Sequence, residues 1–128
     1  AVNELTAIGR GDWPAVTQIV FRNYQWGAEK RNTTLWYQDN FVGTELNYEV
    51  SYAGIAEACN LKGVVARTME DLTAALNQAI KDQMENGVTT LIEAMINQEL
   101  GEPFRRDAMT APVAVAGIDA KDMRTQQV

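Results

Sequence analysis

The sequence predicts an α/β protein with three layers, in which helices cover both faces of a mostly parallel sheet. The order of segments along the chain predicts it. Short apolar segments rich in β-branched residues alternate with helical segments along residues 1–96, and this alternation is typical of parallel sheets. Residues 97–128 carry Pro, Gly and charge without clear periodicity. We therefore expect one domain over residues 1–96 and a C-terminal tail over residues 97–128.

The first elements are expected before residue 48. Apolar residues recur at helical spacing over residues 2–8. The segment AVTQIVF at residues 15–21 is short, apolar and β-branched, as buried strands are. Residues 23–47 then form a long polar and aromatic segment, with a short helix expected near residues 27–34. Loops of this length inside compact domains are usually functional.

A second helix–strand unit is expected after this segment. Ser51 is a favourable N-cap for a helix that ends near Asn60. Residues 61–63 contain Gly and predict a turn into the short strand VVAR at residues 64–67.

The strongest helix and the third strand complete the alternation. Thr68 and Asp71 have the spacing of a capping box, with Asp in place of the usual Glu. An apolar stripe follows, and Asn86-Gly87 predicts the C-terminal cap of this helix. The apolar segment VTTLIEAMI at residues 88–96 predicts the third strand.

Composition excludes several functions and partners. The net charge is −6 and the basic residues are scattered, so we expect no nucleic-acid partner and no anionic membrane surface. A single cysteine, Cys59, excludes an internal disulfide and fits a reducing, cytoplasmic compartment. Histidine is absent from the chain, so an imidazole base or ligand cannot come from it.

The end of the first strand is a candidate cofactor site. Ligands of open parallel sheets bind beyond the carboxyl ends of the strands, where the chain delivers VFRNYQWG. Asn23 offers a neutral oxygen to a hard cation, a following carbonyl offers a second, and Gly27 allows close approach of a bound group. A magnesium-bound phosphate ester fits this chemistry. On spacing alone, a plain turn role for Asn23 is the stronger interpretation.

Two charged features are weaker candidates. Glu93 lies inside an apolar strand and needs partners if it is buried. It is more simply explained as a strand-end residue or as the partner of an arginine such as Arg67. In FRRDAM, at Phe104–Met109, Arg105 and Arg106 can clamp an anion, although an exposed charge cluster is the simpler interpretation.

Three segments together resemble a known family. They are VFRNYQWGAEKRNTTLWYQDNFVGTEL, SYAGIAEACNLKGVVART and TTLIEAMINQELGEPFRRDAM. They are similar to the C-terminal part of the sulfoacetaldehyde acetyltransferase family, within the thiamine-diphosphate-dependent, acetolactate-synthase-like superfamily. The resemblance covers essentially the whole chain, and QWGAEK and GEPFRRD are specific to the family.

The resemblance implies thiamine diphosphate and Mg²⁺ as cofactors. The superfamily holds the metal with the Asp of a G-D-G motif, an Asn of an Asn-Asn pair and a backbone carbonyl. Here the pair is replaced by Arg22-Asn23, so the implied metal ligands are Asn23 and the carbonyl of Gln25. We expect the aromatic side chains of residues 23–47 to cover the cofactor. The implied cofactor-binding residues are Asn23, Tyr24, Gln25, Trp26, Gly27 and Ala28.

The resemblance also implies a reaction and a truncated chain. The family converts sulfoacetaldehyde and phosphate to acetyl phosphate and sulfite, in taurine catabolism. The G-D-G motif would lie just before Ala1, so we expect a diphosphate-binding domain cut at its N-terminal strand. The family's catalytic Glu lies in another domain. We therefore expect no catalytic residue here, an inactive fragment, and a homo-oligomer when the protein is complete.

Two other functions remain open on the sequence. One is a related thiamine-dependent decarboxylase or acetolactate-synthase-like enzyme, against which the QWGAEK segment argues. The other is a non-catalytic interaction module that docks through an open sheet edge, because an uncovered edge strand favours pairing between chains.

Overall fold

The computed structural model describes residues 2–99 of the chain. Of the predicted tail over residues 97–128, residues 100–128 therefore lie outside the described residues. Seven elements follow in order. They are α1 (Val2–Ile8), β1 (Thr17–Arg22), α2 (Gly27–Trp36), α3 (Tyr52–Ala58), β2 (Lys62–Ala66), α4 (Met69–Asn86) and β3 (Thr90–Met95).

The described chain divides into two units. The first contains the residues up to Gln25 together with Glu45–Gln98, and it holds the sheet with α1, α3 and α4. Within the described residues, Trp26–Thr44 belongs to the second unit and contains α2. The short helix expected near residues 27–34 is therefore confirmed, two residues longer than predicted.

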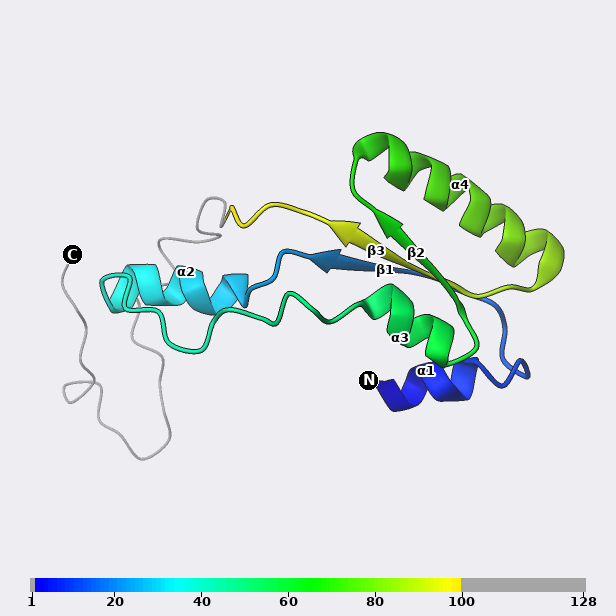
Figure 1. Cartoon of the computed structure of the whole chain (residues 1–128), viewed down its shortest axis with the longest axis horizontal. Coiled ribbons are helices and arrows are strands. Elements are labelled where there is room, and N and C mark those ends of the chain that lie inside the picture. Colours follow the sequence, from blue (N-terminus) through cyan, green and yellow to red (C-terminus); the bar gives the residue numbers. More distant parts are fainter. Residues whose placement is uncertain (1, 100–128) are drawn as a thin grey trace, which may run out of the picture. The chain divides into compact units, whose positions relative to one another are not determined.

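The three strands of the first unit form one parallel sheet in the order β1-β3-β2 (Figure 1). Thr90 of β3 lies opposite Thr17 of β1 and Lys62 of β2. Parallel neighbours need crossover connections, and α4 supplies the one from β2 to β3. The predicted parallel α/β fold is confirmed.

Helices cover both faces of this sheet, as Figure 1 shows with α4 on one side and α3 and α1 on the other. Successive strand residues point to opposite faces. Ile92 packs in a cluster with Ala66 and Ala79, and residues of α4 surround it. Glu93, the next residue of β3, bonds to the backbone at the start of α3 instead. Because β3 is central, all of its residues except Met95 are buried.

Both predicted caps of α4 are confirmed. The Thr68 hydroxyl accepts from the Asp71 N–H at 3.0 Å, and the Asp71 carboxylate accepts from the Thr68 N–H at 3.1 Å. Gly87 ends the helix in the left-handed conformation, with φ of 63°. Ser51 caps α3 as predicted, because its hydroxyl accepts from the Gly54 N–H at 3.0 Å.

The predicted turn at residues 61–63 is wrong, because β2 already begins at Lys62. Asn60 makes the turn instead, in the left-handed conformation with φ of 63°. Gly63 lies within the strand, where a Cβ would fall 2.3 Å from the Ala53 carbonyl oxygen. The glycine therefore permits close packing of β2 under α3 rather than a change of direction.

Candidate functional site

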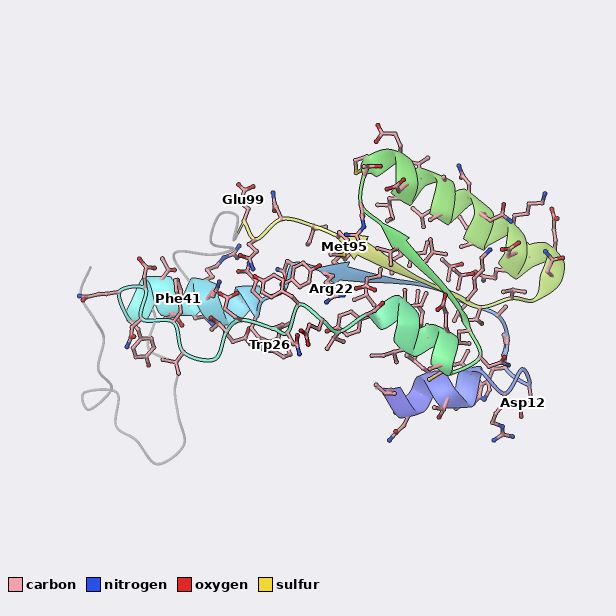
Figure 2. All side chains as sticks on the ribbon, in the orientation of Figure 1. Asp12, Arg22, Trp26, Phe41, Met95 and Glu99 are labelled. Atoms are coloured by element: carbon pink, nitrogen blue, oxygen red, sulfur yellow. The ribbon has the colours of Figure 1, made fainter. Side chains whose placement is uncertain are left out.

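Polar residues gather where β1 and β3 end. The two strands end together, with Arg22 opposite Met95, and Figure 2 shows both residues at this edge. The carboxyl ends of parallel strands are where ligands of such sheets bind. The Arg22-Asn23 pair singled out in the sequence therefore lies at the expected edge.

A tight turn follows directly on β1. Tyr24 has a φ of 59°, in the left-handed region that a bulky residue rarely adopts. The Asn23 Oδ1 accepts from the Gln25 N–H at 3.2 Å, which is the geometry of an Asx turn. The turn role weighed for Asn23 is thus present. This bond occupies one lone pair of the amide oxygen and leaves the second for another partner.

Gln25 is held in place by its side chain and by its neighbours. The side chain is buried and donates from Nε2 to the Gln98 carbonyl at 2.8 Å. Gln25 also pairs with Glu45 in an antiparallel bridge, which is closed by the Leu46 N–H donating to the Tyr24 carbonyl at 2.8 Å. In a pair of this type, the bridging bonds are made by the residues on either side. The Gln25 carbonyl is therefore not used by the bridge.

Glu93 is buried and pairs with Arg22, not with Arg67 as the sequence suggested. Val20 and Val65 lie opposite Glu93 on the two neighbouring strands, so Arg22 and Arg67 are each two positions further along. β1 continues through Arg22, whereas β2 ends at Ala66. The Arg67 N–H already bonds the Asp71 carboxylate at 3.1 Å as the chain turns into α4.

The Glu93 carboxylate accepts three hydrogen bonds, one of them from its charge partner Arg22. Its Oε2 accepts from the Ala53 N–H at 2.9 Å and from the Ser51 hydroxyl at 3.2 Å, while Oε1 accepts from Arg22. Burial by itself raises the pKa of Glu93, but the bonds from Ala53, Arg22 and Ser51 together lower that pKa below its ordinary value. Glu93 is therefore ionised near neutral pH and joins β3 to the start of α3.

Arg22 extends this network into the segment before α3. Its Nη2 donates to the Tyr48 carbonyl at 3.0 Å and lies 3.4 Å from the Asn47 carbonyl. The guanidinium lies over the ring of Tyr24 at 4.4 Å and over that of Tyr52 at 5.4 Å. Tyr24 in turn stacks on Tyr48, with ring centroids 4.4 Å apart. The Tyr24 ring is thus packed within the first unit.

The other three residues implied as cofactor contacts belong to the second unit. Trp26 precedes α2, its N–H donates to the Thr44 carbonyl at 2.8 Å, and its side chain is 54% exposed. Gly27 and Ala28 form the first turn of α2. Their role in cofactor binding stays a prediction, as do those of Asn23, Tyr24 and Gln25.

Sequence reasoning missed two contributors to this region. Tyr48 supplies a carbonyl to Arg22 and a ring to Tyr24. Gln98 accepts from Gln25 and lies beyond the end of β3. The signal for Gln98 was its place just after a strand, at the carboxyl edge. Tyr48 has no comparable local signal. The Phe104–Met109 segment lies outside the described residues.

The described residues 2–99 hold neither an acidic metal cluster nor a membrane-spanning helix. They contain no group of three or more His, Cys, Asp or Glu side chains placed to hold a metal ion. No helix among them combines the length and the apolar character that a bilayer-spanning helix requires. The neutral oxygens around Asn23 and Gln25 remain the candidate metal ligands in this part of the chain.

A parallel sheet with polar residues at its carboxyl edge is typical of α/β domains that bind a cofactor. Residues 1–94 match the family "Thiamine pyrophosphate enzyme, C-terminal TPP binding domain", and the chain belongs to this family. Thiamine pyrophosphate is the same compound as thiamine diphosphate.

Three curated relatives of the chain share one enzyme name, sulfoacetaldehyde acetyltransferase. The chain is 81% identical over 128 residues to sulfoacetaldehyde acetyltransferase of Roseovarius nubinhibens, which is all of this chain and 21% of that protein. It is 76% identical to the sulfoacetaldehyde acetyltransferase of Rhodobacter capsulatus, over 98% of this chain and 21% of the relative. A probable sulfoacetaldehyde acetyltransferase of Rhizobium meliloti is 65% identical, over 99% and 21%. The chain thus spans about a fifth of the length of these relatives.

Proposed function

We propose that this chain is the diphosphate-binding part of a thiamine-diphosphate-dependent acetyltransferase that converts sulfoacetaldehyde and phosphate to acetyl phosphate and sulfite. The single observation that carries the proposal is the 81% identity over all 128 residues to a sulfoacetaldehyde acetyltransferase. Membership of the thiamine pyrophosphate family supports the cofactor assignment. Because the chain spans about a fifth of its relatives, the proposed reaction belongs to the complete protein.

The residues present fit a magnesium–diphosphate group at the end of β1. Mg²⁺ prefers hard oxygen ligands and commonly shares them between protein, water and phosphate. Asn23 supplies an amide oxygen with one lone pair left over from the Asx turn. The Gln25 carbonyl is left unused by the neighbouring bridge. These two neutral oxygens support the assignment of Asn23 and Gln25 as the chain's metal ligands.

In this proposal the chain binds and orients rather than performing the chemistry. Thiamine diphosphate, when bound, would supply the electron sink that the reaction needs. Asn23 and the Gln25 carbonyl hold the metal, and the left-handed turn at Tyr24 keeps these two ligands in fixed relation. Trp26, Gly27 and Ala28 follow in sequence and are proposed to contact the cofactor. No residue of this chain is assigned a catalytic step.

The metal assignment is tested by Asn23→Ala in the full-length protein. Calorimetric titration of thiamine diphosphate in MgCl₂ measures the affinity of the protein for the Mg²⁺–cofactor complex. Loss of an outer-shell partner lowers metal affinity about 10–100-fold, and we expect the loss of a direct ligand to lower it at least as much. Asn86→Ala is the matched control, because Asn86 is an exposed residue at the end of α4. Equal affinity in Asn23→Ala and the native protein would remove Asn23 from the metal site.

The finer features follow from the same resemblance and are proposed with it. They are Mg²⁺ as the metal, sulfoacetaldehyde and phosphate as small-molecule partners, a cytoplasmic location and a homo-oligomeric complete protein. Sedimentation velocity of the full-length protein tests the last of these. A single monomeric species across a wide concentration range would contradict it.

A non-catalytic docking role is the second candidate, and one observation favours it. Among the described residues β1 lies at one edge of the sheet, and Phe21, on its α4 side, is 65% exposed. Exposed edge strands favour pairing with other chains. Sizing chromatography of the chain with Phe21→Ser tests this role. A monomer both before and after the substitution would count against it.

A further inference from the structure

Arg22, which replaces the first Asn of the family motif, makes hydrogen bonds and a ring contact of its own. Arg22 is buried and bonds Glu93 with one amino group and the Tyr48 carbonyl with the other. Its guanidinium carbon, Cζ, lies 4.4 Å from the centre of the Tyr24 ring. A planar, permanently charged group is suited to such simultaneous bonding and stacking.

Those contacts converge on the turn that carries the proposed metal ligands. Tyr24 sits between Asn23 and Gln25 in the left-handed conformation. Such conformations persist when the surroundings fix them. Here the Tyr24 ring contacts both the Arg22 guanidinium and the Tyr48 ring, and the Tyr24 carbonyl accepts from the Leu46 N–H. The contacts on the ring and the bond to the carbonyl both stabilise this conformation.

Glu93 anchors this arrangement to the core of the first unit. It is 1% exposed on the central strand and is bonded to Ala53 and Ser51 at the start of α3. Its position is therefore set by the sheet and by α3. An arginine paired to it cannot swing away without leaving a buried charge unpaired, which is costly.

We propose that the Arg22–Glu93 pair positions the Asn23–Gln25 turn, so that Arg22 acts on the metal site through Tyr24 rather than by touching the metal. The inference rests on the proposed function for the identity of the ligand. Its structural half, the control of the turn by Arg22, does not depend on that function. Arg22 is accordingly a positioning residue.

The test compares Arg22→Met and Arg22→Lys in the full-length protein. Arg22→Met keeps an apolar stem but removes the bonds to Glu93 and Tyr48. We expect about 10–100-fold weaker Mg²⁺ binding at saturating thiamine diphosphate, as for other outer-shell partners. Arg22→Lys keeps the charge without the planar fork and should recover part of the loss. Arg10→Met is the matched control, because Arg10 pairs with Asp12 on the surface.

Hydrogen exchange provides a readout that general loss of stability does not reproduce. In Arg22→Met, peptides covering Gln25 and Leu46 should exchange faster, since both amides bond within the turn. A peptide covering Thr90 should be unchanged, because its N–H bonds Val16 at the opposite end of the sheet. Faster exchange in all three peptides, or in none, overturns the inference.

The outcomes separate this inference from the proposed function. If Asn23→Ala leaves Mg²⁺ binding intact, the metal assignment fails, while the exchange data still decide whether Arg22 controls the turn. If Asn23→Ala weakens binding and Arg22→Met does not, the positioning role fails alone.

Should Arg22→Met not fold, Tyr24→Leu replaces it, because Tyr24→Leu removes the ring stack and keeps the Arg22–Glu93 ion pair. Unchanged exchange at Gln25 in Tyr24→Leu would then overturn the inference.

Discussion

Arg22 of β1 and Glu93 of the central strand β3 form a buried ion pair. Arg22 lies two positions beyond Val20, the residue of β1 that is opposite Glu93. Both side chains lie on the α3 face of the sheet, where Glu93 also accepts bonds from Ser51 and Ala53. One carboxylate thus connects β1, β3 and the start of α3. The pair stands directly before Asn23, the residue proposed to bind the metal.

Removing the Glu93 carboxylate should strongly destabilise the chain. Breaking a buried pair by deleting one partner costs about 3–5 kcal/mol, because the other charge is left buried. We expect Glu93→Ala to reduce the free energy of unfolding in urea by this amount. Glu85→Ala, on an exposed position of α4, should change it by less than about 0.5 kcal/mol. Equal effects in the two variants would show that the ion pair contributes nothing to stability.

Acid should remove the contribution of Glu93. Its pKa is lowered in the folded state from an ordinary value of 4.5. A group of this kind stabilises the fold above its unfolded pKa, and the stabilisation is lost as the pH falls through the folded pKa. The difference in unfolding free energy between the native chain and Glu93→Gln should therefore be constant from pH 7 to about 5 and shrink below pH 4.5. A difference that persists unchanged at pH 3 would contradict an ionised Glu93.

The capping box at the start of α4 should be worth about 0.5–2 kcal/mol, the usual cost of replacing a Thr cap by Ala. Thr68→Ala removes the acceptor for the Asp71 N–H. The same substitution at Thr73, exposed in the interior of the same helix, should be neutral or slightly stabilising because Ala is the better helix former. Thermal unfolding followed by circular dichroism measures both. Equal losses would indicate that the cap has no special role.

Gly54 and Gly63 should respond oppositely to alanine, because their surroundings differ. A Cβ on Gly63 would lie 2.3 Å from the Ala53 carbonyl oxygen, so α3 must shift, and we expect a loss of about 1–3 kcal/mol. A Cβ on Gly54 would meet only the Ser51 side chain at 3.4 Å, an ordinary contact. Gly54→Ala should be neutral or stabilise by up to about 1 kcal/mol. Tolerance of Gly63→Ala in urea unfolding would argue against close packing of β2 under α3.

Local signals explain which parts of the fold were predictable. The Thr68–Asp71 box and Gly87 act through neighbouring residues, so their pattern in the sequence determines the ends of α4. The alternation of strands and helices likewise determined the parallel class of the sheet. The turn predicted at Gly63 was wrong because a glycine in the sequence is equally consistent with a turn and with a strand that packs closely against a neighbour. Only the neighbouring α3 distinguishes the two.

The amino-acid sequence by itself determined the α/β class, the helix caps and the position of Asn23 at the end of the first strand. Each of these depends on residues close together in the chain. Tertiary structure decided the partner of Glu93. Arg22 and Arg67 both lie two positions past a residue opposite Glu93. β1 continues to Arg22 while the chain leaves β2 at Ala66 for the cap of α4. Which arginine reaches the carboxylate depends on where each strand ends, and that is set by packing between segments distant in the sequence.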